Sequence, residues 1–182
     1  MRNKIVGYPA MLAIMIVILT VACAKPAASS SSISNPKTAA DWYNKGAILM
    51  GNNKFQDAIP AFQKALELDP KDVDSWKNIG VCYAEMGNYS EAASAYDSAI
   101  QIKPDDPESW HEKGAALAQT GRTDDALAAY SKALDIYPYQ AGWWMDKGDL
   151  LKKLGRASEA QQCYQKAAQL DEGVDTDKPL TQ

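Results

Sequence analysis

The chain has one histidine, two phenylalanines and three cysteines in 182 residues, and this scarcity excludes several kinds of active site. His111-Glu112 begins like H-E-x-x-H, the zinc-binding helix of metalloproteases, which needs a second imidazole four residues later. That position is Ala115, and no other histidine exists to complete a ligand set. The sequence also contains no P-loop, no G-x-S-x-G and no Cys-His pair at plausible reach. We therefore expect no catalytic activity, no bound metal and no cofactor.

Basic residues are also scarce. Lys and Arg number 19 against 23 Asp and Glu, which gives a net charge of −4 at pH 7. Because nucleic acid selects for clustered Lys and Arg, we do not expect it as a partner. Cys82 and Cys163 are separated by several predicted helices, whereas a disulfide needs Cα atoms within about 7 Å of each other. We predict that both are small, unpaired core residues.

Long apolar runs are absent apart from one near the N-terminus. Arg2 and Lys4 precede residues 10–22, an apolar stretch without proline. Its length suits the core of a signal peptide, about 7–15 residues, whereas a membrane-spanning helix needs roughly 20. We interpret residues 1–22 as a signal peptide, with an uncleaved signal anchor and ordinary secretion as the alternatives.

The end of that run, L-T-V-A-C at 19–23, resembles a prokaryotic lipobox. The resemblance implies cleavage before Cys23 and a lipid on its sulfur, although the usual Leu three residues earlier is Thr20 here. Residues 23–38 are rich in Ser, Ala and Pro, which is typical of a flexible tether. Positive charge favours a cytoplasmic N-terminus. The lipoprotein and the signal anchor would therefore both hold the rest of the chain outside the cytoplasm, tethered to a membrane.

Most of the chain is a repeat with a period of 34 residues. The residues that recur in phase are Trp42, Trp76, Trp110 and Trp144; Gly46, Gly80, Gly114 and Gly148; Ala58, Ala92, Ala126 and Ala160; and Phe62, Tyr96, Tyr130 and Tyr164. Proline closes the first three units at Pro70, Pro104 and Pro138. This pattern resembles the tetratricopeptide (TPR) repeat family over residues 39–174.

The resemblance implies an all-α fold, a right-handed α-solenoid of four helical hairpins. Its units would be residues 39–72, 73–106, 107–140 and 141–174, followed by a polar tail at 175–182. The residues themselves agree with the helical assignment, because Trp76, Ile79 and Tyr83 stand at i, i+3 and i+7 on one helix face. The small residue at each repeated glycine would let the two helices of a hairpin approach closely.

Helix ends are marked by several local signals. Asp106-Pro107 predicts an N-cap followed by a first-turn proline, and Thr38 with Asp41 resembles a capping box. Gly and Asn tolerate the left-handed conformation that ends a helix. We expect this conformation at Asn53, Gly87, Gly121 and Gly155. Pro60 is tolerable if the second helix of the first unit is capped near Gln56.

In TPR proteins the first helices of the hairpins line a concave groove that usually holds an extended peptide or a partner helix. Carried onto this sequence position by position, the resemblance predicts as groove residues Tyr43, Asn44, Lys77, Asn78, Val81, His111, Glu112, Met145, Asp146 and Asp149. The groove that grips chaperone carboxylates is a poor match, because Glu112 stands where it needs a basic residue. The acidic side chains Glu112, Asp146 and Asp149 favour a ligand of positive or polar character. His111 is a groove-face residue on this interpretation, or else a solvated helix residue.

Two further features concern the last unit. Tyr137, Tyr139, Trp143 and Trp144 crowd the junction of units three and four, where packing and partner binding are both open. Gln161 and Ala168 replace larger apolar residues of the earlier units, as a terminal repeat requires. The sequence thus predicts a non-catalytic interaction scaffold. The alternative is a structural component or assembly factor that self-associates through its C-terminal repeat.

Overall fold

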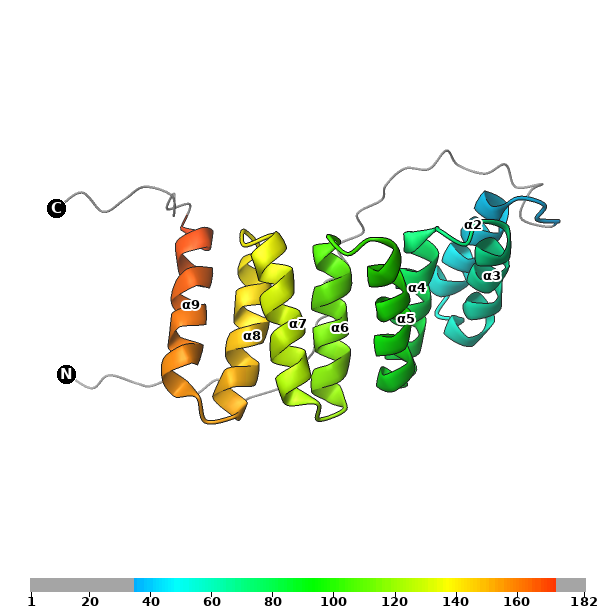
Figure 1. Cartoon of the computed structure of the whole chain (residues 1–182). Helices are drawn as coiled ribbons and strands as arrows, with labels where there is room; N and C mark the ends of the chain where they lie inside the picture. Colours follow the sequence, from blue (N-terminus) through cyan, green and yellow to red (C-terminus); the bar gives the residue numbers. More distant parts are fainter. Residues whose placement is uncertain (1–34, 173–182) are drawn as a thin grey trace, which may run out of the picture.

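The computed structural model describes residues 35–172, and within that range the chain is helical without a strand (Figure 1). The helices are α2 Ala39–Gly51, α3 Phe55–Leu68, α4 Val73–Glu85, α5 Tyr89–Ile102, α6 Pro107–Gln119, α7 Thr123–Ile136, α8 Ala141–Lys153 and α9 Ala157–Asp171. The predicted all-α solenoid of helical hairpins is confirmed. The signal peptide, Cys23, most of the predicted tether and the tail at 175–182 lie outside the described residues.

Each predicted unit contains one helical hairpin, and the hairpins stand in a row with α2 and α9 at opposite ends (Figure 1). Along the row, each helix packs against the next one in the chain. The first helices also approach one another across units, α2 against α4 and α6 against α8. Within residues 35–172 the second helices of successive units make no comparable contact. At the first and third junctions the first helices therefore lie on the inner, more crowded side of the solenoid. None of the described helices combines the length and apolarity needed to cross a membrane.

The repeated glycines allow the two helices of each hairpin to touch. A methyl group on Gly80 would lie 2.7 Å from the Tyr96 ring, and one on Gly114 would lie 2.8 Å from the Tyr130 ring. Gly46 and Gly148 meet Phe62 and Tyr164 in the same way. Real Cβ atoms do not approach so closely, so the repeated ring excludes any larger residue at these positions. The predicted role of these glycines is confirmed.

The helix ends follow the predicted signals. Asn53 has a φ of 58°, and Gly87, Gly121 and Gly155 have φ between 74° and 79°, all in the left-handed region. Thr38 and Asp41 form the predicted capping box. Asp106 caps α6 by accepting from the Ser109 N–H, with Pro107 in the first turn. One detail of the prediction is wrong: α3 begins at Phe55 after Lys54. Pro60 therefore lies in the second turn of the helix, where its ring is exposed.

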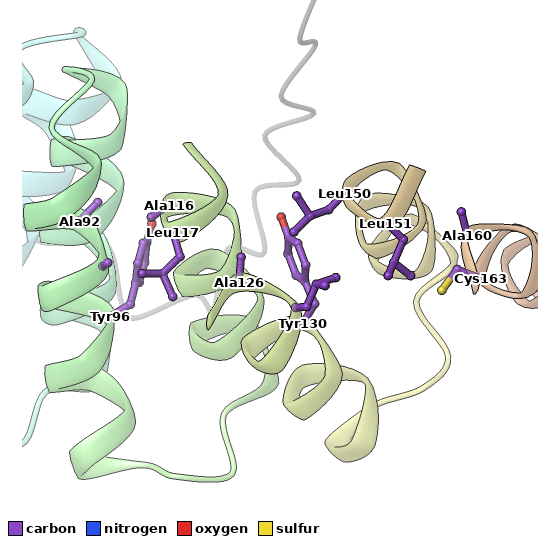
Figure 2. Packing of buried hydrophobic residues seen from close by; sticks show 12 residues of the cluster. Ala92, Tyr96, Ala116, Leu117, Ala126, Tyr130, Leu150, Leu151, Ala160 and Cys163 are labelled. Carbon is purple, nitrogen blue, oxygen red and sulfur yellow. The ribbon is translucent and has the colours of Figure 1, made fainter. Parts of the chain in front are cut away.

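The core is built between units as much as within them. Ile59 and Leu66 of the first unit pack into one cluster with Ile79 of the second. A second cluster runs through the last three units, where Figure 2 shows the Tyr96 ring beside Leu117 and the Tyr130 ring close to Leu150. Each hairpin thus covers the apolar face of its neighbour, which is how a stacked repeat buries a continuous core.

Cys82 and Cys163 belong to this core. Both side chains are buried and neither forms a disulfide. The prediction that they are small, unpaired core residues is confirmed. Gln161 and Ala168, on the outer face of α9, are exposed.

Candidate partner-binding surface

The predicted groove residues lie on α2, α4, α6 and α8, the helices of the inner side. Side chains at corresponding positions of successive units touch, so much of this surface is made of contacts between units. At the first junction the Asn78 amide donates to the Tyr43 hydroxyl at 3.1 Å. The Tyr43 ring meets Phe62 edge-on at 5.6 Å between centroids. Asn44 and Val81 are half-buried, and Val81 packs against the core cluster of the last three units.

At the second junction Lys77 is held by two carboxylates, Asp106 at the end of its own unit and Glu108 at the start of the next. Its ammonium bonds Glu108 and lies 3.6 Å from Asp106, and its side chain is only 20% exposed. Burial lowers the pKa of Lys77, but the bond to Glu108 and the negative charge around it outweigh that effect and raise the pKa. Lys77 therefore stays charged and connects units two and three.

The third junction is built around His111. The imidazole Nε2 lies 2.8 Å from an Asp146 oxygen of the next unit, and Trp143 stacks on the ring at 5.0 Å between centroids. Tyr130 packs at 5.3 Å on another side. His111 is 9% exposed, so the alternative of a solvated helix residue is wrong. The physical reason is Trp143, which covers from the following unit a position that the helical phase alone leaves open.

The electrostatics of this junction favour an imidazolium. Burial lowers the pKa of His111, but the bond to Asp146 and the neighbouring Glu112 carboxylate outweigh burial and raise the pKa to about 9. Nδ1 lies 3.5 Å from a Glu112 oxygen, an ion-pair distance without hydrogen-bond geometry, and it is a buried atom with no hydrogen-bond partner. At neutral pH the junction therefore holds one buried cation between two half-exposed carboxylates.

The three acidic groove residues are not equally available. Asp146 is engaged by His111, and Asp149 accepts a hydrogen bond from the Tyr164 hydroxyl at 2.7 Å, which with burial raises the pKa of Tyr164 to about 12. The side chains of Glu112 and Asp146 remain 47% and 49% exposed. Met145, beside Asp146, is also exposed. The charge that faces a ligand is therefore smaller than three free carboxylates would provide.

The crowded aromatic residues form a connected surface. Tyr137 meets Tyr139 edge-on at 5.7 Å and Trp143 at 6.1 Å. Trp144 has a different place, since its indole N–H donates to the Pro138 carbonyl at 2.8 Å and its ring packs on the core. Sequence reasoning did not identify Trp143 as the cover of His111. The repeat itself contained a signal, because Trp143 stands where the second and third units have the small residues Ser75 and Ser109. Both serines are fully buried in the structure.

Reactive groups are few in the part of the chain that the structure describes. No group of three His, Cys, Asp or Glu side chains there could hold a metal ion. Burial raises the pKa of Cys82 to about 11 and also raises that of Cys163, so neither thiol is an activated nucleophile. The arrangement holds neighbouring repeats together and presents side chains for contact.

Comparison with known proteins gives the same picture. Three sequence profiles described as tetratricopeptide repeat match residues 43–107, 95–128 and 117–174. No curated protein matches the chain. Similar solved structures include a crystal structure of MamA, with 21% identity over 79% of this chain and 84% of that chain and a TM-score of 0.73. Another is "MamA 41-end" from Desulfovibrio magneticus RS-1, with 19% identity over 80% and 82% and a TM-score of 0.72. At these identities the likeness shows a shared fold.

Proposed function

Because the chain belongs to the tetratricopeptide repeat family, we propose that it is a non-catalytic scaffold that holds a peptide segment or a helix of another protein along its inner surface. Repeats of this kind create extended concave surfaces that bind proteins. One observation supports the proposal above others. The first helices approach one another at the first and third junctions, and the core leaves side chains such as Asn44, Glu112 and Met145 at least partly exposed on them.

The proposal includes a membrane tether outside the cytoplasm. Its support is the sequence before the repeats, where an apolar run ends at Cys23 within a stretch that resembles a lipobox. The Cys23→Ala variant is expected to lose incorporation of an alkyne-labelled palmitate and to accumulate as a larger precursor. A variant that stays in the membrane at unchanged size would instead favour the uncleaved signal anchor.

Partner binding is tested by affinity capture of the full chain from membranes, followed by binding measurements with each purified candidate. Met145→Arg changes an exposed inner residue and is expected to weaken binding about tenfold or more. Gln162→Arg adds the same charge to an exposed outer position of α9 and serves as the control. Equal loss with both variants, or loss with neither, would argue against recognition on the inner surface.

Self-assembly is a second candidate, as a structural component or as an assembly factor of an envelope or secretion complex. In the third unit Trp110 donates to the Pro104 carbonyl at 2.9 Å, and Lys113 pairs with Asp97 of the preceding unit at 2.6 Å. The equivalent Trp42 and Lys45 begin the described array, where another copy could take the place of a preceding repeat. Mass measurement over a range of protein concentrations distinguishes this candidate from a monomeric binder.

A further inference from the structure

The junction of units three and four carries apolar surface that the repeat itself does not need. At the positions of Tyr137 and Tyr139, the first unit has Asp69 and Lys71, and the second has Lys103 and Asp105. The turns that lead from unit one to unit two and from unit two to unit three therefore carry charged residues where the third such turn carries tyrosines. Tyr137 and Tyr139 are 45% and 53% exposed. Exposed aromatic side chains beyond what packing requires mark interaction sites.

These rings form one surface with the carboxylates at the junction. Contacts run from Tyr139 to Tyr137, then to Trp143, and from Trp143 to the His111 ring. Asp146 and Glu112 lie on the two nitrogens of that ring. We call Tyr137, Tyr139, Trp143, Glu112 and Asp146 the aromatic-acidic patch.

We propose that the aromatic-acidic patch is a docking site for a segment of another protein that carries a Lys or Arg side chain next to an apolar anchor. Aromatic faces attract cations and accept apolar groups, and nearby carboxylates select for positive charge. The buried His111 neutralises only part of the charge. A ligand meets the half-exposed Glu112 and Asp146 side chains, whereas the side chain of His111 is 11% exposed.

A second copy of this chain is a poorer occupant of the patch. In a symmetric dimer the same surface meets itself, so the carboxylates of one copy would face those of the other. The chain as a whole is also acidic, with a net charge of −4. Charge complementarity therefore favours a basic segment of a different protein.

The inference rests on the proposed function and is tested with a defined probe. A library of random twelve-residue peptides displayed on phage is selected on the full chain in detergent micelles. The strongest binders are then synthesised with a fluorophore, and their Kd is measured by fluorescence polarisation. We expect selected peptides to share Lys or Arg beside an aromatic or aliphatic residue.

Two variants probe the patch with little risk to folding. Tyr139→Ser removes a half-exposed ring and is expected to raise Kd about tenfold or more. Glu112→Gln removes one carboxylate, leaves the Asp146 bond to His111 intact, and is expected to raise Kd about threefold and reduce its salt dependence. Leu68→Ser is the matched control, since Leu68 is 55% exposed at the end of α3, far along the row from the patch.

The possible outcomes separate the two proposals. Binding that is lost in Tyr139→Ser and kept in Leu68→Ser supports the patch. If the peptides bind Tyr139→Ser and Glu112→Gln with the same Kd as the parent chain, the aromatic-acidic patch is not the docking site. The proposed interaction scaffold would not be contradicted by that result. A folded chain, verified by circular dichroism, that selects no peptide would count against the scaffold and against the patch with it.

Discussion

Individual residues of this protein derive their roles from neighbouring helices, in the same hairpin or in the next one. Gly114 lies in a helix directly against the Tyr130 ring, which leaves no room for a larger residue. His111 is a polar residue that Trp143 and Asp146 of the next unit enclose. In both cases a contact from another helix decides which side chain the position accepts.

Replacing Gly114 with Ala is expected to destabilise the fold by about 1–3 kcal/mol, because the new methyl group would overlap the Tyr130 ring and approach the Ala126 carbonyl. Gly142→Ala is the control. Beyond the adjacent residues and backbone of its own helix, no atom lies within 4 Å of a methyl group at Gly142, in the first turn of α8. Alanine there should be neutral or stabilising by less than about 1 kcal/mol. Urea unfolding of the two variants measures the difference, and equal effects would contradict the close approach.

His111 should make stability depend on pH. Its pKa is about 9 in the folded chain and ordinarily 6.5, so the folded state binds the proton more tightly. The stabilisation is fully present below pH 6.5 and is lost as pH rises through 9, by an amount on the order of 3 kcal/mol at most.

The measurement compares urea unfolding at pH 6 and pH 9.5 in the parent chain and in His111→Asn. The variant serves as the control because both proteins share the buried thiols, which also titrate at high pH. Since the chain has a single histidine, its C2 proton also gives one titrating signal by NMR. A midpoint near 6.5, or the same pH dependence in both proteins, would refute the buried imidazolium.

At the scale of helices, the caps differ in quality from one unit to the next. Asp106 accepts from both the N–H and the hydroxyl of Ser109, while Gln140, in the equivalent place before α8, makes no side-chain cap. Burial raises the pKa of Asp106, but the Ser109 bonds and the Lys77 charge outweigh it and lower the pKa. The first helix of the third unit therefore has a side-chain cap at its N-terminus, whereas the first helix of the fourth unit has none.

Opposite changes at these two caps should have opposite effects. Asp106→Ala is expected to destabilise by about 1–2 kcal/mol, because it removes the cap and leaves the Ser109 N–H without it. Gln140→Asp should stabilise by about 0.5–1 kcal/mol by giving the Trp143 N–H, which donates to the Gln140 carbonyl at 3.1 Å, a side-chain acceptor as well. The backbone at Gln140 already has the extended conformation that a cap needs. Thermal unfolding of both variants checks the signs, and a stabilising Asp106→Ala would be incompatible with its role as a cap.

At the scale of the whole molecule, the row of hairpins is not uniformly joined. Helices α7 and α8 approach each other less than α3 and α4 or α5 and α6 do. Trp143 stands at this junction where the equivalent Ser75 and Ser109 are fully buried. We infer that the larger ring keeps α8 from approaching α7 as closely. Since each repeat contacts only its neighbours, a weak junction lets the last hairpin open separately.

Amide hydrogen exchange should reveal that difference. We expect α8 and α9 to exchange faster than α2 and α3, although both hairpins end the described array. His111→Asn should accelerate exchange in α8 and α9 further, because it removes the charged bond to Asp146, and should leave α2 and α3 unchanged. Uniform exchange along the chain would show that the junctions are equivalent.

The sequence by itself determined the hairpins, the turn inside each hairpin at left-handed residues such as Gly87 and Gly121, and the close approach at the repeated glycines. These features repeat in phase and depend on contacts within one unit, so a linear pattern carries them. The contacts and the burial of His111 and Lys77 were decided only by the tertiary structure. Each is a groove position by helical phase, yet Trp143 and Glu108 of a following unit engage it. A contact between units depends on the relative position of two adjacent hairpins. That position changes wherever a side chain such as Trp143 replaces a smaller one.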